Sequence, residues 1–168
     1  MMVEDIKKNI LKEERHKEGI LRLILDDQKN KNALSELMLT KLIKAINFAS
    51  EDNSIKVIII AAAGNVFCSG HNLKDITNAR KSSDEGASYF LNLFNLCSSL
   101  MQLIVNCQKP VIAEVNGTAT AAGCQLVASC DLAVSSDSSF FATPGVNIGL
   151  FCSTPMVALS RNVNTKDA

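Results

Sequence analysis

The sequence of 168 residues carries no formal net charge, because 17 lysine and arginine residues balance 17 aspartate and glutamate residues. A protein that binds nucleic acid through a basic surface needs an excess of positive charge, so we expect no nucleic-acid partner. The length is that of one domain with a substantial core. With 47% hydrophobic residues, the composition excludes collagen-like and wholly disordered chains.

Charge is also scarce in the second half of the chain. Residues 86–108 and residues 138–160 contain no Asp, Glu, Lys or Arg. Each run is long enough to cross a bilayer, but the first is interspersed with polar residues and the second contains two prolines and two glycines. We therefore expect no membrane span, and we interpret both runs as segments buried against other protein.

The common cysteine, nucleotide and hydrolase signatures are missing as well. The six cysteines include no C-x-x-C pair, and no secretory signal precedes them, which favours buried, reduced thiols in an intracellular protein. No GxGxxG, P-loop or GxSxG motif occurs, so nucleotide binding by those routes has little support and Ser69 is a poor candidate for a nucleophile. Acidic residues among the first 15 argue against a transit peptide.

The hydrophobic pattern predicts an α/β fold with parallel strand pairing. Residues 1–18 are expected to be a charged lead-in, frayed or strand-like, to a core of residues 19–168. The predicted strands cover residues 20–25, 55–61, 110–115, 132–135 and 140–142, and the second of these is expected to be covered on both faces. One predicted helix begins after the N-cap Ser35 and continues to residue 49. Two more predicted helices cover residues 89–104 and 120–129. Residues 76–86 are expected to form a mobile loop.

Two glycine-containing corners follow predicted strands, at residues 64–73 and 116–125. The second corner places Ala121, Ala122 and Gly123 at a helix start, where the first N–H groups have no internal partner and the dipole favours negative charge. A free N–H from the first corner would complete an oxyanion hole. The alternative is a tight turn that needs small residues for packing, and the pattern alone favours this alternative.

The residues of these corners resemble the crotonase (enoyl-CoA hydratase/isomerase) superfamily. The resemblance spans residues 18–160 and rests on residues 32–34, 67–73, 115–117, 123–126, 130–133 and 141–145. Residues 69–71, 119–131 and 142–155 resemble one group of hydratase domain-containing proteins within it. The resemblance favours a ligand site at the corners. It implies a ClpP/crotonase-like spiral of ββα units that binds acyl-CoA thioesters, here truncated and lacking the C-terminal helical region.

By position, the resemblance implies an oxyanion hole formed by the backbone N–H groups of His71 and Ala122. The CoA portion of the substrate would lie along two segments, at Lys31, Ala33, Leu34, His71, Asn72, Leu73 and Lys74. Lys31 and Lys74 are candidates for phosphate contacts, although the alternative for each is solvated surface. No separate cofactor and no metal are implied, because CoA is part of the thioester substrate.

Two departures from the family pattern concern proton transfer. Family hydratases use two glutamates to activate water, and Gln125 and Gly145 occupy those positions here. Neither residue exchanges a proton near neutral pH, and general acid–base assistance is worth about 10²–10⁴-fold. His71 is an alternative base, although we favour a side chain turned to solvent. Asp75 and Cys152 are weaker options, and Asp131 is better interpreted as a structural cap.

Three functions remain open. The first is an enoyl-CoA hydratase-like protein of fatty-acid and lipid metabolism, a lyase or isomerase. The second is a catalytically inactive acyl-CoA-binding regulator, and any proton-exchanging group near the thioester would distinguish the two. The third is a chain that folds poorly, which its solubility would reveal. The resemblance implies a homotrimer or hexamer and a mitochondrial location, with the cytoplasm as the alternative.

Overall fold

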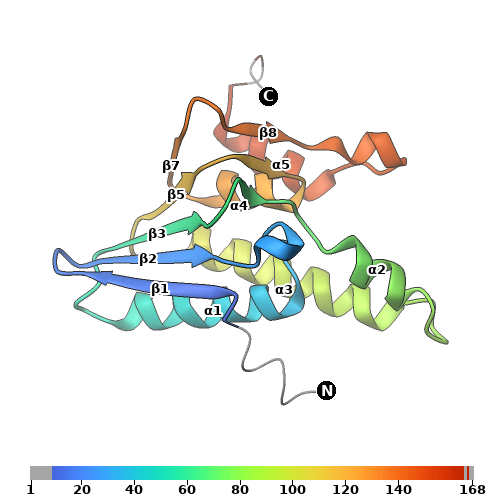
Figure 1. The fold of residues 1–168 in the computed structure, drawn as a ribbon, viewed down its shortest axis with the longest axis horizontal. Coiled ribbons are helices and arrows are strands. Elements are labelled where there is room, and N and C mark those ends of the chain that lie inside the picture. The colour runs from blue at the N-terminus through green and yellow to red at the C-terminus, as the bar shows by residue number, and fades with distance from the viewer. Residues whose placement is uncertain (1–8, 165, 167–168) are drawn as a thin grey trace.

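Two β-sheets and the helices packed on them make up the part of the chain that the computed structural model describes, residues 9–164 and residue 166 (Figure 1). The strands are β1 (Leu11–His16), β2 (Ile20–Leu25), β3 (Val57–Ala62), β4 (Val66–Cys68), β5 (Val111–Val115), β6 (Thr118–Thr120), β7 (Leu132–Ser135) and β8 (Phe140–Ala142). The larger sheet has the order β1-β2-β3-β5-β7 and the smaller has the order β4-β6-β8.

The strand pairing is parallel, as predicted, except that β1 runs antiparallel to β2. Of the two alternatives for the charged lead-in, the strand is confirmed for Leu11–His16. Ile10 and Leu11 are only 3% and 7% exposed and belong to the hydrophobic core. The sheet therefore begins inside the segment of residues 1–18, because these two apolar side chains anchor it.

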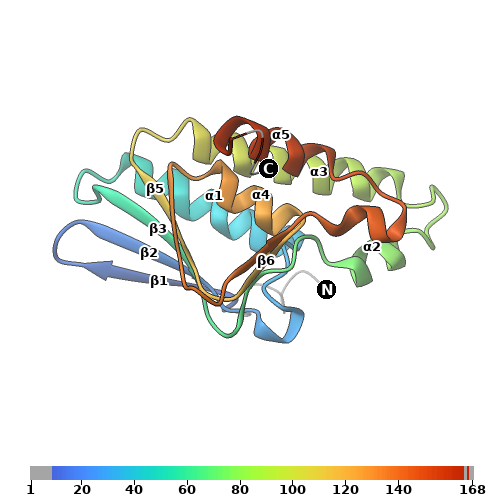
Figure 2. The same ribbon diagram turned by 90° about the horizontal axis from the view of Figure 1, so that it is seen from above.

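Most of the helices lie on one side of the larger sheet. The full set is α1 (Glu36–Glu51), α2 (Leu73–Ala79), α3 (Ala87–Val105), α4 (Ala122–Ser129) and α5 (Ser153–Asn162), with short 3-10 helices η2 (Gln28–Asn30) and η3 (Pro144–Ile148). Figure 2 shows α1, α3, α4 and α5 on one side of β1, β2, β3 and β5. The predicted cap of α1 is confirmed, because the Ser35 side chain accepts a hydrogen bond from the Met38 N–H.

Helix α3 corresponds to the first uncharged run. By length and composition alone it is apolar enough to cross a membrane. One face of α3 nevertheless packs into the protein core through Leu93, Cys97, Leu100, Met101 and Ile104. This contact accounts for the apolar residues on that face, whereas Leu91, Phe94 and Val105 are more than half exposed.

Two stretches differ from the sequence prediction. The expected mobile loop of residues 76–86 begins with the end of α2, whose start is capped by the Asn72 side chain. The expectation was wrong there because one capping residue was enough to start a short helix. Strand β3 is only partly covered on its second face, since Val57 and Ile59 are half-buried.

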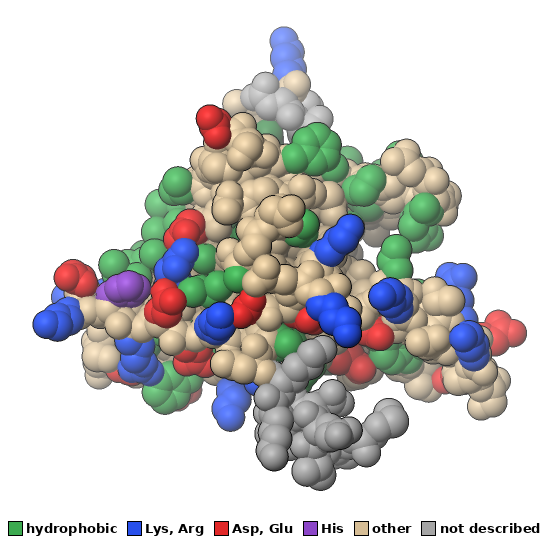
Figure 3. All heavy atoms as spheres, viewed as in Figure 1, with side chains coloured by type: hydrophobic (Ala, Val, Ile, Leu, Met, Phe, Trp, Pro, Cys, Tyr) green, Lys and Arg blue, Asp and Glu red, His purple; other side chains and the backbone are tan. Residues whose placement is uncertain are grey.

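The second uncharged run, residues 138–160, is not buried within the described chain. Phe140, Val146 and Phe151 are 61%, 71% and 70% exposed. Figure 3 shows charged side chains gathered over the lower part of the molecule and few over the upper part, where β8 and α5 lie in Figure 1. Only a few of these residues, such as Gly145 and Pro155, are packed inside the described chain, so the described chain itself does not supply the protein surface that was expected to cover this run.

Candidate functional site

The first corner begins where β4 ends, at Ser69 and Gly70. The Ser69 N–H donates to the Lys31 carbonyl at 3.2 Å, and the Leu34 N–H donates to the Gly70 carbonyl at 2.8 Å. Gly70 has a φ of +85°, which side chains rarely permit. These contacts hold the loop before α1 against the corner.

Asn32 supports the first corner from inside the protein. It is 1% exposed and has a φ of 51°. Its Oδ1 accepts the Asp27 N–H at 2.8 Å, and its Nδ2 donates to the carbonyls of Ala63 at 3.0 Å and Val66 at 2.7 Å. Asn32 therefore joins the loop to the end of β3 and the start of β4. The sequence analysis used this residue only as part of a motif, although asparagine is enriched at left-handed backbone positions.

The second corner joins β6 to α4 through Ala121. This residue has φ 51° and ψ −123°, a conformation that is strained for any residue except glycine. The Ala121 N–H donates to the Ala142 carbonyl at 2.9 Å, and its carbonyl accepts the Gln125 N–H at 3.1 Å. The helix starts at Ala122, two residues later than predicted. Neighbouring bonds thus hold a strained turn in place, as is common at functional sites.

The two corners lie side by side. A Cβ atom built on Gly70 would lie 3.0 Å from Ala121 Cβ and 3.2 Å from the Ala122 nitrogen. A Cβ atom on Gly123 would lie only 2.3 Å from the Cys68 carbonyl oxygen, closer than real Cβ atoms come. Packing therefore does require small residues here, and the same packing brings the Ala122 amide next to the first corner.

The backbone N–H groups of His71 and Ala122 have no hydrogen-bond acceptor among the described residues. For Ala122 the reason is its place as the first residue of a helix, because the opening N–H groups of a helix have no partner within it. The helix dipole adds partial positive charge at this end. Two adjacent free donors suit a negatively charged or polarised oxygen atom.

Both corners open into a cavity of about 1420 Å³ between α3, α4, η3 and α5. His71 and Ala122 line this cavity together with Gln125 and Gly145, so the structure brings these four predicted site residues to one place. Apolar side chains on the wall include Phe94, Met101, Val105, Leu150 and Phe151. The arrangement combines a large apolar space with a few polar groups, as is usual for small-molecule sites.

The His71 side chain is not turned to solvent, so this part of the sequence interpretation was wrong. Its ring packs edge-on against Phe94 with centroids 5.6 Å apart, and its Nδ1 lies 3.3 Å from the Leu34 carbonyl oxygen. Burial lowers the pKa of His71, although the contact with the Leu34 carbonyl opposes this effect. The imidazole is therefore neutral near pH 7 and is a weaker base than an exposed histidine.

Gln125 lies on the first turn of α4 and is 8% exposed. Its Oε1 accepts no hydrogen bond from the part of the chain that the structure describes. An unpaired buried acceptor costs about 1–3 kcal/mol, so most such atoms have a partner in the native state. The residue lines the adjoining cavity, but the Oε1 atom itself is buried.

Gly145 is buried and leaves no room for a side chain. A Cβ atom at this position would lie 2.8 Å from the Leu150 carbonyl oxygen and closer still to the sulfur of Cys152. The position therefore supplies no proton-exchanging group, and the surrounding chain has filled the space that such a group would need.

The segments expected to meet CoA contribute in different ways. Ala33 and Leu34 are 3% and 0% exposed, so their side chains belong to the core and only their backbone lies near the corner. Lys31 and Lys74 are exposed, and Leu73 lines the cavity. Asn72 caps α2 by accepting the Lys74 N–H at 3.1 Å, so it fixes the loop that follows His71.

The remaining candidate bases, Asp75, Asp131 and Cys152, have different surroundings in the structure. The Asp131 carboxylate accepts the Val111 N–H at 2.8 Å, which confirms its structural role at the start of β5. Asp75 lies in the first turn of α2. Cys152 lines the cavity and is half-exposed. Asp131 lines it too, but its carboxylate is already engaged by the Val111 N–H.

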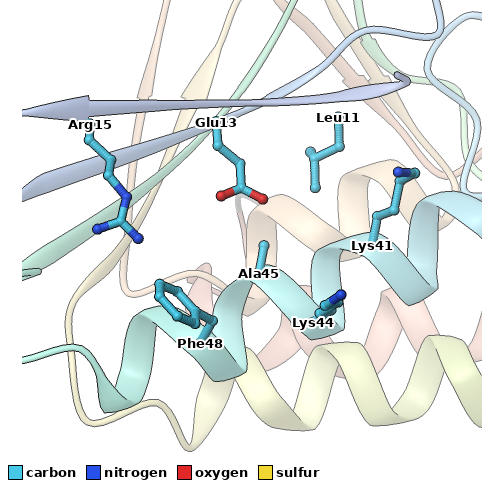
Figure 4. Close-up of a pocket in the computed structure, with 7 residues that line it drawn as sticks. All are labelled: Leu11, Glu13, Arg15, Lys41, Lys44, Ala45 and Phe48. Carbon is cyan, nitrogen blue, oxygen red and sulfur yellow. The ribbon is translucent and has the colours of Figure 1, made fainter. Parts of the chain in front are cut away.

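A second, smaller hollow of about 330 Å³ lies between β1 and α1 (Figure 4). One of its polar side chains is already engaged, because Arg15 pairs with Asp52 at 3.0 Å and stacks over Phe48 at 5.2 Å from the ring centroid. No group of three or more His, Cys, Asp or Glu side chains among the described residues could hold a metal ion. The corners and their cavity are thus the strongest candidate site.

Known proteins share this sequence and fold. The enoyl-CoA hydratase/isomerase family model matches residues 15–168. The mitochondrial enoyl-CoA hydratase domain-containing protein 3 of Xenopus laevis is 57% identical over 150 residues, which cover 89% of this chain and 49% of that protein. The chain spans about half the length of the curated relatives it matches.

Comparison with solved structures supports the same family assignment. The crystal structure of human enoyl Coenzyme A hydratase domain-containing protein 3 superposes with a TM-score of 0.85 at 50% identity, covering 95% of this chain and 60% of that chain. An enoyl-CoA hydratase from Mycobacterium smegmatis gives a TM-score of 0.86 at 45% identity with the same coverage. The expected crotonase-like fold is confirmed, and the chain belongs to the enoyl-CoA hydratase/isomerase family.

Proposed function

We propose that this protein binds acyl-CoA thioesters, with the thioester oxygen between the N–H groups of His71 and Ala122 and the acyl chain in the large cavity. The observation that carries the proposal is the pair of free amides at adjoining corners. Such donors act most strongly on the negative charge of an enolate, and one donor of this kind contributes roughly 3–4 kcal/mol to a transition state.

The CoA portion would follow the exposed side of the first corner. Asn72 and Leu73 would border it, and Lys31 and Lys74 would meet its phosphates, since both lysines are exposed near that corner. Ala33 and Leu34 would contribute backbone only, because their side chains are in the core. CoA enters as part of the substrate, so the proposal needs no separate cofactor.

Within the family we propose an enoyl-CoA hydratase-like role in fatty-acid metabolism, in mitochondria as the names of its relatives state. Turnover by two glutamates is not part of the proposal, because Gln125 and Gly145 offer no exchangeable proton. The second candidate, an inactive acyl-CoA-binding regulator, is favoured by the closed space around Gly145.

We also propose that the protein forms a trimer or hexamer. Such an assembly would cover exposed apolar residues such as Leu132 and Val134, and light scattering would test it.

Calorimetric titration with butyryl-CoA tests binding. Ala122→Pro deletes one donor at the first position of a helix, where proline is sterically accepted. We expect this variant to weaken binding by up to about tenfold, as the loss of a hydrogen bond between uncharged groups does. His71→Ala keeps its backbone donor and should still bind. Glu36→Pro, at the first position of α1, is the matched control for proline itself.

Two outcomes would contradict the proposal: no saturable binding by folded wild-type protein, or unchanged affinity in Ala122→Pro. Turnover is a separate measurement, made from the loss of enoyl-thioester absorbance with crotonyl-CoA in excess. Sustained turnover favours the enzyme, whereas binding without turnover favours the regulator. Gln125→Glu restores one carboxylate and shows whether the oxyanion site can support hydration when one acid is present.

A further inference from the structure

We infer that Cys152 is a nucleophilic thiol of the same cavity, which adds covalently to carbon 3 of a 2-enoyl-CoA thioester. The inference rests on the proposed function, because it requires the thioester oxygen at the N–H groups of His71 and Ala122. It goes beyond that function because it assigns a covalent reaction to a residue that lies outside both corners.

Cys152 is tied to the second corner by a short path. The Ala121 N–H donates to the Ala142 carbonyl at 2.9 Å, which fixes the end of β8 against the corner. Gly145 follows three residues later, and a Cβ atom on it would lie 2.6 Å from Cys152 Sγ. The thiol therefore packs on the strand end that the corner itself holds, and it lines the cavity into which His71 and Ala122 open.

The other two cysteines on the cavity wall are poor nucleophiles. Cys97 and Cys130 are 5% and 9% exposed, and burial raises the pKa of their thiols to about 11 and about 12. The Cys130 thiol also donates to the Leu126 carbonyl at 3.3 Å. Cys152 is half-exposed, and its side chain makes no capping hydrogen bond although it occupies the N-cap of α5.

Gln125 places a further polar side chain on the wall of the same cavity. The residue is 8% exposed, and its buried Oε1 atom accepts no hydrogen bond from the described residues. The thiol, the orphan amide and the two free N–H groups thus surround one space.

The reaction is a conjugate addition and needs no oxidant or reductant. The thiolate sulfur forms a bond to carbon 3 while the electrons of the double bond between carbons 2 and 3 move toward the thioester oxygen. That oxygen carries the negative charge between the two backbone donors. The proton lost by the thiol is then taken up at carbon 2, which restores the thioester. One S–H bond has added across one C=C bond, and CoA remains attached.

The test is intact-mass spectrometry of the full chain after incubation with crotonyl-CoA, followed by peptide mapping. We expect a mass gain equal to one crotonyl-CoA, located on Cys152 and absent from Cys152→Ala and Cys152→Ser. The adduct should amount to one equivalent of crotonyl-CoA per chain. Butyryl-CoA has no double bond and should give no adduct. Ala122→Pro should slow the addition about 10²–10³-fold, as loss of an oxyanion donor does.

Cys107 provides the control for general thiol reactivity, because it is also half-exposed but lies outside the cavity wall. Equal labelling of Cys107 and Cys152, or an adduct on any other residue, would overturn the inference. So would the absence of an adduct in wild-type protein that binds butyryl-CoA, and in that case the proposed function would stand. Failure to bind butyryl-CoA as well would remove both.

Discussion

A side chain at position 145 would have to begin where the sulfur of Cys152 already lies. The distance from a Cβ atom built on Gly145 to Cys152 Sγ is 2.6 Å, and the Leu150 carbonyl oxygen would lie at 2.8 Å. The position is therefore closed to any residue larger than glycine unless its surroundings move. A glutamate at this position would therefore require neighbouring residues to move as well.

Gly145→Glu should lower the free energy of unfolding by about 1–3 kcal/mol, because it overpacks a buried position. Cys152→Gly in the same chain should restore only part of the loss, since it removes the sulfur but leaves the Leu150 carbonyl in place. Urea unfolding followed by circular dichroism measures both effects. Wild-type stability in Gly145→Glu would show that η3 moves aside without cost.

Gly123→Ala should disturb the site and the fold together. The added methyl group would lie 2.3 Å from the Cys68 carbonyl oxygen, where neither backbone can yield easily. We expect a loss of about 1–3 kcal/mol in unfolding free energy and weaker butyryl-CoA binding. Gly149→Ala is the matched control, because nothing lies within 4 Å of its new Cβ and its φ of +73° costs only about 1 kcal/mol. Equal losses in the two variants would contradict the packing argument.

Asn32→Ala should destabilise the protein by about 2–4 kcal/mol, because it leaves a buried N–H and two carbonyls without their side-chain partner. The corner beside it should loosen, so hydrogen exchange at Ser69 should accelerate. Asn106→Ala removes an exposed amide that bonds only to the Gln102 carbonyl and serves as the control. A loss no larger than in that control would mean that water replaces the Asn32 amide.

Asp52 should make the free energy of unfolding depend on pH in the acidic range. Hydrogen bonds from the Ser54 hydroxyl and Ser54 N–H, and then from Arg15, lower its pKa from 3.8 to about 2. Because the folded pKa lies below the unfolded one, the stabilisation is present above pH 3.8 and is lost as pH falls toward about 2. Urea unfolding between pH 6 and pH 2 should show a smaller decline in Asp52→Asn than in wild type. Identical declines would contradict this assignment.

The sequence predicted those elements whose pattern is long or strongly capped. Helices α1 and α3 have repeated apolar positions, and the β-branched run in β3 identifies a core strand. Strands β4 and β6 have three residues each, which is too short for a periodic signal, and both were missed. Helix α5 was missed because its residues are largely exposed and carry no clear apolar stripe.

The residues of the candidate site could be predicted from the sequence, but the short distance between its two corners could not. The resemblance placed donors at His71 and Ala122, yet only the fold shows Gly70 against Ala121. The burial of Leu34 and the contact of His71 with Phe94 depend on segments distant in sequence, which no local pattern reports. The packing of Cys152 on Gly145 has the same origin, because η3 turns the chain back on itself.

The two donors are peptide groups, and a peptide N–H is the same in every residue except proline. Genetic variation at position 71 can therefore replace the side chain and leave the donor unchanged. Variation at Gly117 or Gly123 instead moves the chain that carries the donors, because a Cβ atom there would lie 2.1 Å or 2.3 Å from a backbone carbonyl oxygen. In a library of all single substitutions sorted by acyl-CoA binding, position 71 would tolerate many side chains. Gly117 and Gly123 would tolerate few, although neither has a side chain that could contact the ligand.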